Sequence, residues 1–276
     1  MDTFNRTMSK TVPTLGLFMA VVVSPVLAQE FTINELSFEK GELEIQNNGF
    51  VISDAPKGDD EDDGATRLSH QLSIQYGLTN YFLVDFDIGV RRLDGADLEA
   101  SSAALEGLLK FYSSSDNMFF FGVFGGVEFA LQEEDADSFE FGTRFQYGGE
   151  ESDKLGILSM GLEKTFGENR EDGMEFAYGL ILRKSVTKTV SLGVEAFGEI
   201  EDVGNAPRFE DQDHRVGPVI HFAGGGGDDD DDAKGKGEDS ALEDRDVEWG
   251  VNLGVLFGIT EATPDTTFTW NVELTF

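Results

Sequence analysis

Hydrophobic and polar residues alternate with a period of two along most of the chain from about residue 41 onward. The clearest run covers residues 67–76, in which the odd positions are polar and all but one of the even positions are apolar or aromatic. Side chains along a strand point alternately to its two faces, so this run predicts a two-faced strand. A similar run at 82–91 follows a short turn that contains Gly77 and Asn80, and together the runs predict a β-hairpin.

The same alternation recurs and predicts about twelve strands in all. The other strands are expected near residues 40–53, 98–112, 118–131, 138–148, 154–166, 173–186, 189–201, 212–223, 245–258 and 266–276, the first being less regular. Short connections, such as 78–80 and 113–117, alternate with longer ones, such as 54–64 and 202–211. Short turns at one end and longer loops at the other are typical of up-and-down barrels. The sequence therefore predicts an all-β, antiparallel up-and-down barrel.

The chemistry of the two strand faces favours a barrel in a membrane over a soluble one. Many of the expected strands run for about 11–14 residues, which exceeds the usual strand of a globular protein and is close to a tilted bilayer crossing. One face is large and apolar, as at the odd positions of 119–131 and of 249–257, whereas the opposite face is charged or small. A soluble barrel of this size would need an unusually large dry core. Lipid outside and a polar lumen inside account for both faces.

The first 28 residues have the layout of a secretory signal peptide. Arg6 and Lys10 precede an apolar run at 15–23, and small residues lead to Ala28, after which we expect cleavage. An N-terminal membrane anchor is the alternative, although the run is short for a spanning helix. Residues 29–276 are then expected to form the outer-membrane barrel domain, with acidic loops at 54–64 and 224–244.

The last expected strand alternates polar residues with a set of apolar ones, namely Phe268, Trp270, Val272, Leu274 and Phe276. In this strand, in the turn at 76–80 and in the stretch 257–260, the chain resembles Gram-negative outer-membrane β-barrel proteins of the transporter and porin-like group. The resemblance implies export through the periplasm, a place in the cell outer membrane and contact with its lipid. It also implies that Phe276 is an assembly signal read by the barrel-assembly machinery.

The resemblance also constrains the topology. If both termini are periplasmic, the strand number is even and the acidic loop at 54–64 lies outside the cell. The same count places the Asp-rich insert at 228–232 on the periplasmic side, where turns are usually short. Either this turn is exceptional, or the strand count is off by one there.

Composition excludes several functions. The chain has 54 Asp and Glu against 20 Lys and Arg, a net charge of -34, which opposes binding to a nucleic-acid backbone. It contains no Cys, which excludes thiolate metal sites and thiol nucleophiles. An acidic excess often indicates disorder, but disordered chains contain few aromatic residues, and this chain has 24 Phe. A membrane barrel can contain both many acidic and many aromatic residues, because the aromatic residues face lipid and the acidic ones lie in the lumen and loops.

The charged residues on the expected inward face are candidate pore-lining residues. They are Asp85, Asp87, Arg91, Glu106, Lys110, Glu128, Glu140, Arg144, Glu163, Glu175, Arg183, Glu195, Arg215 and Glu248, with Glu199, Asp246 and Glu273 as further inward acids. Some of these charges could pair across strands and simply fill the barrel. The excess of acids would still favour cations over anions. We therefore expect a narrow channel or passive transporter for small polar or cationic solutes, without a cofactor or covalent chemistry.

Two other functions are compatible with the same pattern of strands. A non-conducting structural barrel, or one that binds divalent cations or a partner, is the first alternative, and its weak metal candidates are Asp228, Asp229, Asp230, Asp231 and Asp232. Consecutive aspartates lack the spaced ligands of an organised Ca²⁺ loop, so a solvated, cation-attracting loop is favoured there. Weak accumulation of divalent cations is expected at the acidic loops in either case.

An outer-membrane hydrolase is the less favoured alternative, because such a site needs a nucleophile and a base at one rim. The chain has three His. His70 falls on the expected lipid face and His221 in the lumen, while Asp213 and His214 lie near the outer rim on opposite strand faces. The sequence thus predicts a protein that is not an enzyme.

Overall fold

The computed structural model describes residues 33–53, 67–92, 97–133, 135–149, 152–167, 169–170, 172–225 and 247–276. The expected signal peptide at 1–28, the acidic loop at 54–64 and the insert at 228–232 lie outside the described residues, as does Asp246. Within the described residues, no helix has the length and apolar character needed to cross a membrane.

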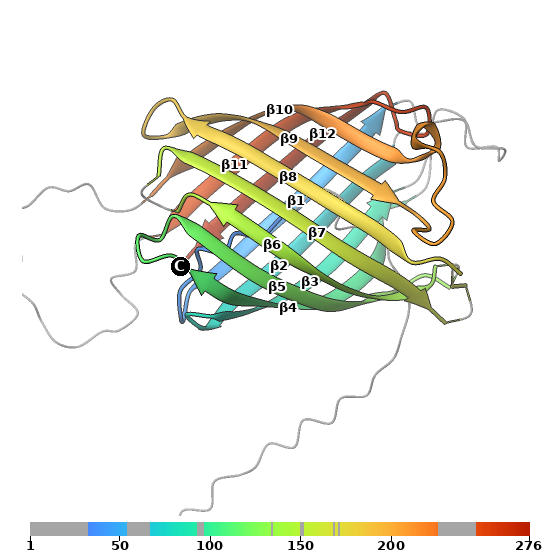
Figure 1. Cartoon of the computed structure of the whole chain (residues 1–276), viewed down its shortest axis with the longest axis horizontal. Helices are drawn as coiled ribbons and strands as arrows, with labels where there is room; N and C mark the ends of the chain where they lie inside the picture. Colours follow the sequence, from blue (N-terminus) through green and yellow to red (C-terminus); the bar gives the residue numbers. More distant parts are fainter. Residues whose placement is uncertain are drawn as a thin grey trace, which may run out of the picture.

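Twelve antiparallel strands close into one barrel, as Figure 1 shows, so the predicted fold class is confirmed. Each strand pairs with its neighbours in sequence, and β12 pairs with β1 to close the ring. The strands are β1 (Leu43–Ser53), β2 (Arg67–Thr79), β3 (Phe82–Arg92), β4 (Glu99–Ser113), β5 (Phe119–Ala130), β6 (Asp137–Tyr147), β7 (Lys154–Phe166), β8 (Glu175–Ser185), β9 (Val190–Ile200), β10 (Asp213–Gly224), β11 (Glu248–Gly258) and β12 (Thr266–Thr275); one 3-10 turn, η1 (Phe209–Asp211), precedes β10.

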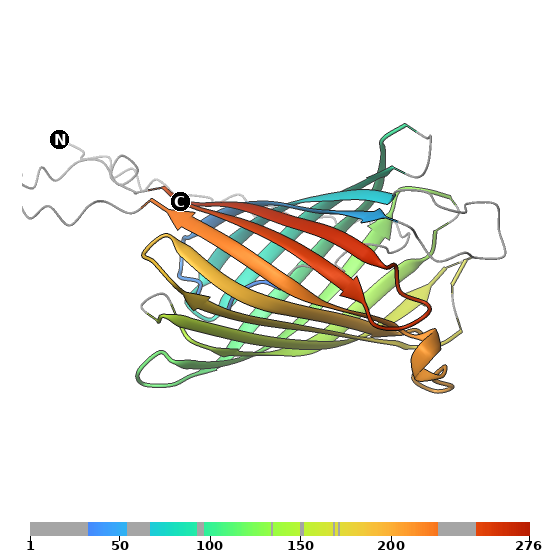
Figure 2. The ribbon, with the colours of Figure 1, turned by 90° about the horizontal axis from the view of Figure 1, so that it is seen from above.

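The two ends of the barrel differ in their connections. We call the end at which β1 begins and β12 ends the terminal rim, and the opposite end the loop rim (Figure 2). The turns after β2, β4, β6 and β8 lie at the terminal rim and are short. The connection between β10 and β11 also begins and ends there, at Gly224 and Glu248, so the count of twelve strands holds. The assignment of the terminal rim to the periplasm stays a prediction.

The outer face is apolar and aromatic, as a lipid-facing surface requires. Exposed residues of this face include Leu72, Ile74, Phe86, Leu105, Phe141, Phe145, Leu253, Phe268 and Val272. At the closing seam the Trp270 indole lies across Gly49, where a Cβ atom would stand 2.2 Å from Trp270 Cζ2. The His70 ring meets the same indole edge-on, with ring centroids 4.9 Å apart. His70 therefore belongs to an aromatic contact on the outer face.

The inward face differs from the expectation that it is only charged or small. Large apolar side chains also point inward and are buried, among them Leu83, Leu108, Phe120, Phe124, Ile157, Ile181, Phe197, Val219 and Leu256. Four of these residues cluster on β3, β4 and β5 with Leu36 and Phe38, which precede β1. The lumen therefore contains a small apolar core of its own.

Candidate permeation path and luminal segment

The predicted pore-lining residues occupy inward positions of their strands, where they alternate with the exposed apolar residues of the outer face. The same holds for Glu199 and Glu273. Their part in permeation stays a prediction. The structure adds the strand register, which decides which of these side chains are neighbours.

Six carboxylates lie in one register row that crosses eight strands. Directly paired positions from β1 to β8 follow one another in the order Glu44, Gln75, Asp85, Glu106, Gly126, Glu140, Glu163 and Glu175. Because the strands are tilted, the row begins near the terminal rim, at the second residue of β1, and ends at the loop rim, at the first residue of β8. We call these eight residues the acidic row.

The acidic row places acidic residues directly opposite one another on neighbouring strands. Asp85 is paired with Glu106, Glu140 with Glu163, and Glu163 with Glu175. Directly opposed like charges destabilise a sheet, whereas opposite charges stabilise it. Gly126 helps to accommodate the arrangement, because a Cβ atom there would lie 3.2 Å from Glu140 Oε1. Whether the inward charges simply fill the barrel or line a path stays a prediction, and one member of the row, Glu106, lies 4.0 Å from the cationic Arg144.

Three cations share a second register row. From β4 to β10 the paired positions are Lys110, Gly122, Arg144, Ser159, Gly179, Phe197 and Arg215. On β4 and β6 this row stands four residues along the strand from the acidic row. The two rows meet at Arg144, whose Nη2 is 4.0 Å from Glu106 Oε1.

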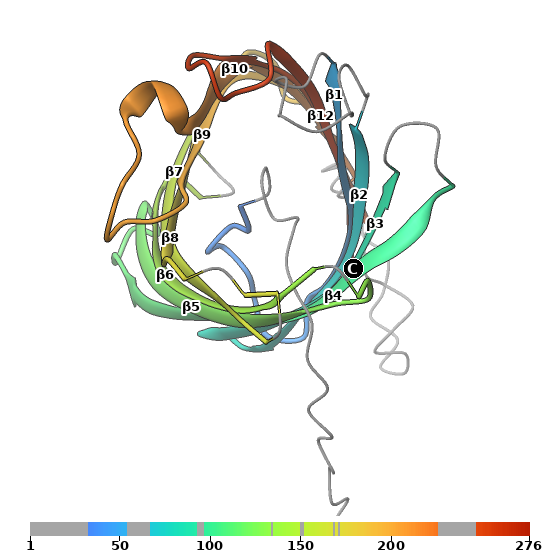
Figure 3. The same cartoon turned by 90° about the vertical axis from the view of Figure 1, so that its right-hand side faces the viewer.

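Residues 33–42 form a segment inside the barrel, which we call the luminal segment. Figure 3, viewed along the barrel axis, shows this blue segment within the ring of strands. Leu36 is 0% exposed and Phe38 is 4% exposed, and both pack on Leu83, Leu108, Phe120 and Phe124. The apolar residues that point inward on β3–β5 thus bury the side chains of the luminal segment.

Polar side chains of the wall bond the luminal segment at alternate residues. Arg144 Nη1 donates to the Asn34 carbonyl oxygen at 3.0 Å, the Leu36 N–H donates to Gln146 Oε1 at 2.6 Å, and Lys110 Nζ donates to the Phe38 carbonyl oxygen at 3.0 Å. Lys110 Nζ also lies 4.4 Å from the centre of the Phe38 ring. Three wall side chains therefore hold an extended backbone.

The Asn34 side chain joins the luminal segment to the acidic row. Its Nδ2 donates to Asp85 Oδ2 at 2.8 Å, and its Oδ1 accepts from Gln75 Nε2 at 2.9 Å. On the other side of the segment, Glu35 Oε1 pairs with Arg183 Nη2 on β8 at 3.0 Å. The segment therefore contacts β3 on one side and β8 on the other, and through Arg144 and Lys110 it also contacts the second row.

The luminal charges divide into two environments. On the covered wall, formed by β3–β6, Asp85 is 1% exposed, Glu106 2% and Arg144 3%. On the facing wall, formed by β7–β12 and β1, a set of inward acids is half-buried: Glu44, Glu163, Glu175, Glu199 and Glu273. Glu128 and Glu140, on β5 and β6 of the covered wall, are half-buried as well. Glu195, also on the facing wall, is buried, and Glu248 is exposed at the terminal rim.

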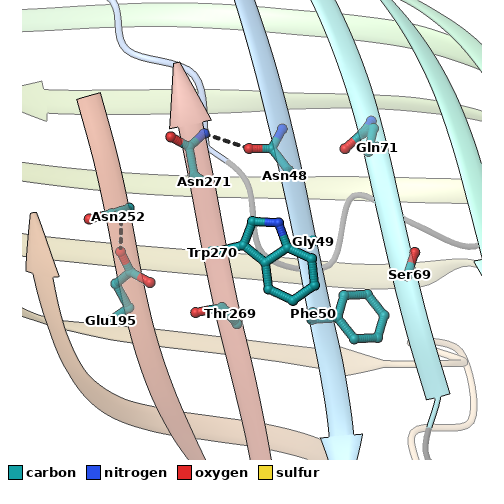
Figure 4. A pocket seen from close by; sticks show the side chains of 10 residues that line it. All are labelled: Asn48, Gly49, Phe50, Ser69, Gln71, Glu195, Asn252, Thr269, Trp270 and Asn271. Atoms are coloured by element: carbon teal, nitrogen blue, oxygen red, sulfur yellow. Dashed lines mark hydrogen bonds between the residues drawn. The ribbon is translucent and has the colours of Figure 1, made fainter. Parts of the chain in front are cut away.

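A pocket on the facing wall and the adjacent β2 presents amides and hydroxyls (Figure 4). Asn271 Nδ2 donates to Asn48 Oδ1 at 2.5 Å, and Asn252 Nδ2 donates to Glu195 Oε1 at 3.2 Å. The lining residues are Asn48, Gly49, Phe50, Ser69, Gln71, Glu195, Asn252, Thr269, Trp270 and Asn271. These groups can both donate and accept hydrogen bonds, which suits uncharged polar solutes.

The other charged candidates near the loop rim make local ion pairs. Arg91 Nη1 lies 2.9 Å from Asp135 Oδ2, and Arg215 Nη2 lies 2.5 Å from Asp213 Oδ2. His214 is on the opposite face of β10 from Asp213 and meets Tyr178 Oη at 3.1 Å and Gln212 Oε1 at 2.9 Å. Its ring also stacks on Phe209 at 4.9 Å. His214 is thus part of an aromatic contact at the loop rim.

Among the residues that the structure describes, no group of three or more His, Asp or Glu side chains is arranged to hold a metal ion. The weak metal candidates Asp228–Asp232 lie outside these residues. Sequence reasoning missed the luminal segment. Within the segment itself the signal was the apolar pair Leu36 and Phe38 just before Gly41, which resembles the start of a strand.

Comparisons with known proteins place the fold. No family model matches the chain, and no curated protein matches its sequence. The COG4313 outer membrane channel from Pseudomonas putida F1 is similar over 91% of this chain and 99% of its own, with 12% identity and a TM-score of 0.54. The NanC porin is similar over 85% of this chain and 98% of its own, with 6% identity and a TM-score of 0.48. At the level of the fold, the resemblance to Gram-negative outer-membrane barrels is confirmed.

Proposed function

We propose that this protein is a narrow outer-membrane channel through which small polar solutes, and cations in preference to anions, diffuse without covalent chemistry. The observation that carries the proposal is the acidic row, which places six carboxylates in register from one rim to the other. The fold supports it, because a barrel of this fold is known as an outer membrane channel.

Adjacent carboxylates give a physical reason for cation preference. Their mutual repulsion falls when a cation lies between them, so the row raises the local concentration of cations. Conduction also requires that each site binds weakly enough to release the ion, and a series of similar neighbouring sites meets this requirement. Glu140, Glu163 and Glu175 form the part of the row that leads to the loop rim.

The residues that fill part of the lumen support a limit to small solutes. The luminal segment and the apolar cluster fill the covered wall, so the remaining space borders the facing wall. Its amides and hydroxyls supply hydrogen bonds for polar solutes that carry no charge. The segment contacts β3 through the bond from Asn34 to Asp85, and it contacts β8 through the ion pair of Glu35 with Arg183. We therefore expect it to exclude large solutes.

The test is the reversal potential of the purified barrel in a planar bilayer under a KCl gradient. Wild-type protein is expected to prefer K⁺, and the triple variant Glu140→Gln, Glu163→Gln, Glu175→Gln to lose most of that preference. The matched control removes three exposed loop-rim charges through Glu201→Gln, Glu261→Gln and Asp265→Asn, and should change it less. Anion preference in the wild type, or equal effects of both triple variants, would refute the cation path.

A non-conducting barrel is the second candidate, and the buried cluster around Leu36 favours it, since this cluster closes part of the lumen. The same recordings decide between the two. If the inserted barrel passes no current in any salt, both as wild type and as the variant Leu36→Ser, Phe38→Ser that frees the luminal residues, the second candidate holds.

We also propose that β12 directs assembly into the outer membrane through the barrel-assembly machinery. The seam supports this, because the Phe276 N–H donates to the Leu43 carbonyl oxygen at 2.9 Å where β12 meets β1. Phe276→Ala is expected to lower the fraction of folded barrel in the outer membrane, as measured by heat-modifiable mobility on gels. A matched Leu274→Ala control keeps the final aromatic residue and should assemble better.

A further inference from the structure

The covered wall is constructed as a binding site for an extended peptide. Arg144, Gln146 and Lys110 address backbone atoms of residues 34, 36 and 38, which are alternate positions of one extended chain. Two of these side chains donate to carbonyl oxygens of the segment, and the one between them accepts from a backbone N–H. Alternating donors and acceptors at this spacing match an extended backbone, and a wall that is merely polar would not need them.

The apolar part of the wall points to the same conclusion. Leu83, Leu108, Phe120 and Phe124 face inward, where bare apolar surface in a water-filled lumen costs about 25 cal/mol per Å². Leu36 and Phe38 cover these residues. Gly122 makes room for the segment, because a Cβ atom there would lie 2.6 Å from Leu36 Cδ2. The wall and the segment therefore form one complementary pair.

The docked segment lies over the terminal-rim half of the acidic row. Asn34 bonds two neighbouring members of the row, Asp85 and Gln75. Arg144, which bonds the Asn34 carbonyl oxygen, stands 4.0 Å from a third member, Glu106. Cations that follow the row would meet the segment here, while Glu163 and Glu175 stay accessible toward the loop rim.

The segment joins the barrel at a glycine turn. Gly41 has φ +85, a conformation that favours glycine, and its N–H donates to the Gly77 carbonyl oxygen at 2.7 Å. Gly77 is also closely approached, since a Cβ atom there would lie 1.9 Å from the Glu39 carbonyl oxygen. This turn anchors the segment beside the end of β2 and supplies a pivot about which residues 33–40 can leave the wall.

We propose that residues 33–40 are the gate of the channel, with the covered wall as their binding site. Docked, the segment interrupts the acidic row near the terminal rim. Undocked, it uncovers Asp85 and Glu106 and completes the cation path between the two rims. This inference rests on the proposed channel function and adds the element that opens and closes it.

The experiment uses the full chain and the absence of natural Cys. The double variant Leu36→Cys, Gly122→Cys should form a disulfide under mild oxidation, because the two side chains are adjacent in the docked state. Oxidation is expected to abolish open events in single-channel recordings, and a reductant to restore them. The two single-Cys variants, treated identically, should not respond.

A release variant tests the opposite direction. Leu36→Ser, Phe38→Ser should increase the open fraction and the K⁺ current, while Leu98→Ser, at an exposed position away from the segment, should behave as wild type. Heat-modifiable mobility on gels confirms that each barrel is folded. If the cross-linked and reduced forms carry equal cation current and the release variant matches wild type, the gate is refuted and the channel stands. If every form, including the release variant, is silent, both the channel and its gate are refuted.

Discussion

The covered wall and the facing wall are built from the same alternating strands, yet they use inward charges in different ways. On the covered wall, Asp85, Glu106 and Arg144 are almost fully buried and contact one another or the luminal segment. On the facing wall, Glu163, Glu175 and several other acids point inward and are half-buried. We therefore expect an inward charge to act in stability or in permeation according to whether the luminal segment covers it.

Arg144 gives the largest expected contrast. Arg144→Met leaves Glu106 buried without its cationic partner, and this should lower the free energy of unfolding by about 3–5 kcal/mol. Arg183→Met on the facing wall removes an ion pair whose partner, Glu35, is 42% exposed, and should cost about 1 kcal/mol or less. Urea titration of the lipid-inserted barrel, followed by Trp fluorescence, measures both. Equal losses would mean that the two walls do not differ in their electrostatics.

Two inward glycines give the next contrast. A Cβ atom at Gly142 would lie 2.4 Å from the Phe124 ring and 2.3 Å from the Met160 carbonyl oxygen, so Gly142→Ala should cost about 1–3 kcal/mol. At Gly250, on the facing wall, the nearest atoms belong to the flexible end of Glu273, which can move aside. Gly250→Ala should therefore cost less than about 1 kcal/mol. If Gly250→Ala lowered the free energy of unfolding more than Gly142→Ala in the same urea titration, the covered wall would not be the more tightly packed of the two.

Ion selectivity should respond more to substitutions on the facing wall than to those on the covered wall, whereas stability should respond more to those on the covered wall. Glu163→Gln removes a half-buried carboxylate from the path and should lower the ratio of K⁺ to Cl⁻ permeability by about twofold. Glu106→Gln removes a carboxylate that is 2% exposed, and with the segment docked the ratio should hardly change. Reversal potentials at low salt distinguish the two variants. A larger effect of Glu106→Gln would assign permeation to the covered wall.

The dependence of K⁺ preference on salt concentration is the smallest expected effect, and it tests the acids of the facing wall together. The Debye length falls from about 10 Å at 0.1 M to about 3 Å at 1 M, so the preference for K⁺ should decrease over this range. The effect of Glu163→Gln should decrease with it. Selectivity that stays constant to 1 M would point to a steric filter at the luminal segment in place of the half-buried acids.

The alternation of polar and apolar residues was sufficient for the strands. β7 has the predicted bounds, 154–166, and the other strands lie within a few residues of theirs. β1 begins at Leu43, later than predicted, because residues 39–41 form the turn that leads from the luminal segment into the barrel. Leu36 and Phe38 alternate with polar neighbours as a strand would, so local pattern could not separate an inner segment from a wall strand.

The candidate site was predictable only in part, since alternation gives the face of a residue and not its neighbour on the next strand. Asp85, Glu106, Glu140 and Glu163 were all expected to point inward, but the sequence contains no information on barrel shear that would align them. The inward Phe120 and Phe124 carried a signal for an apolar partner in the lumen, because a polar lumen gives such side chains no favourable surroundings.

The sequence by itself determined that this chain is an antiparallel barrel of about twelve strands with apolar residues outside and charge inside, because a period of two encodes the two faces of every strand. Only the tertiary structure decided that six acids form one row and that three cations form another, because strand tilt and register arise from closing the ring. It also decided that Leu36 and Phe38 lie inside the barrel, since burial of an apolar segment depends on a wall assembled from distant strands.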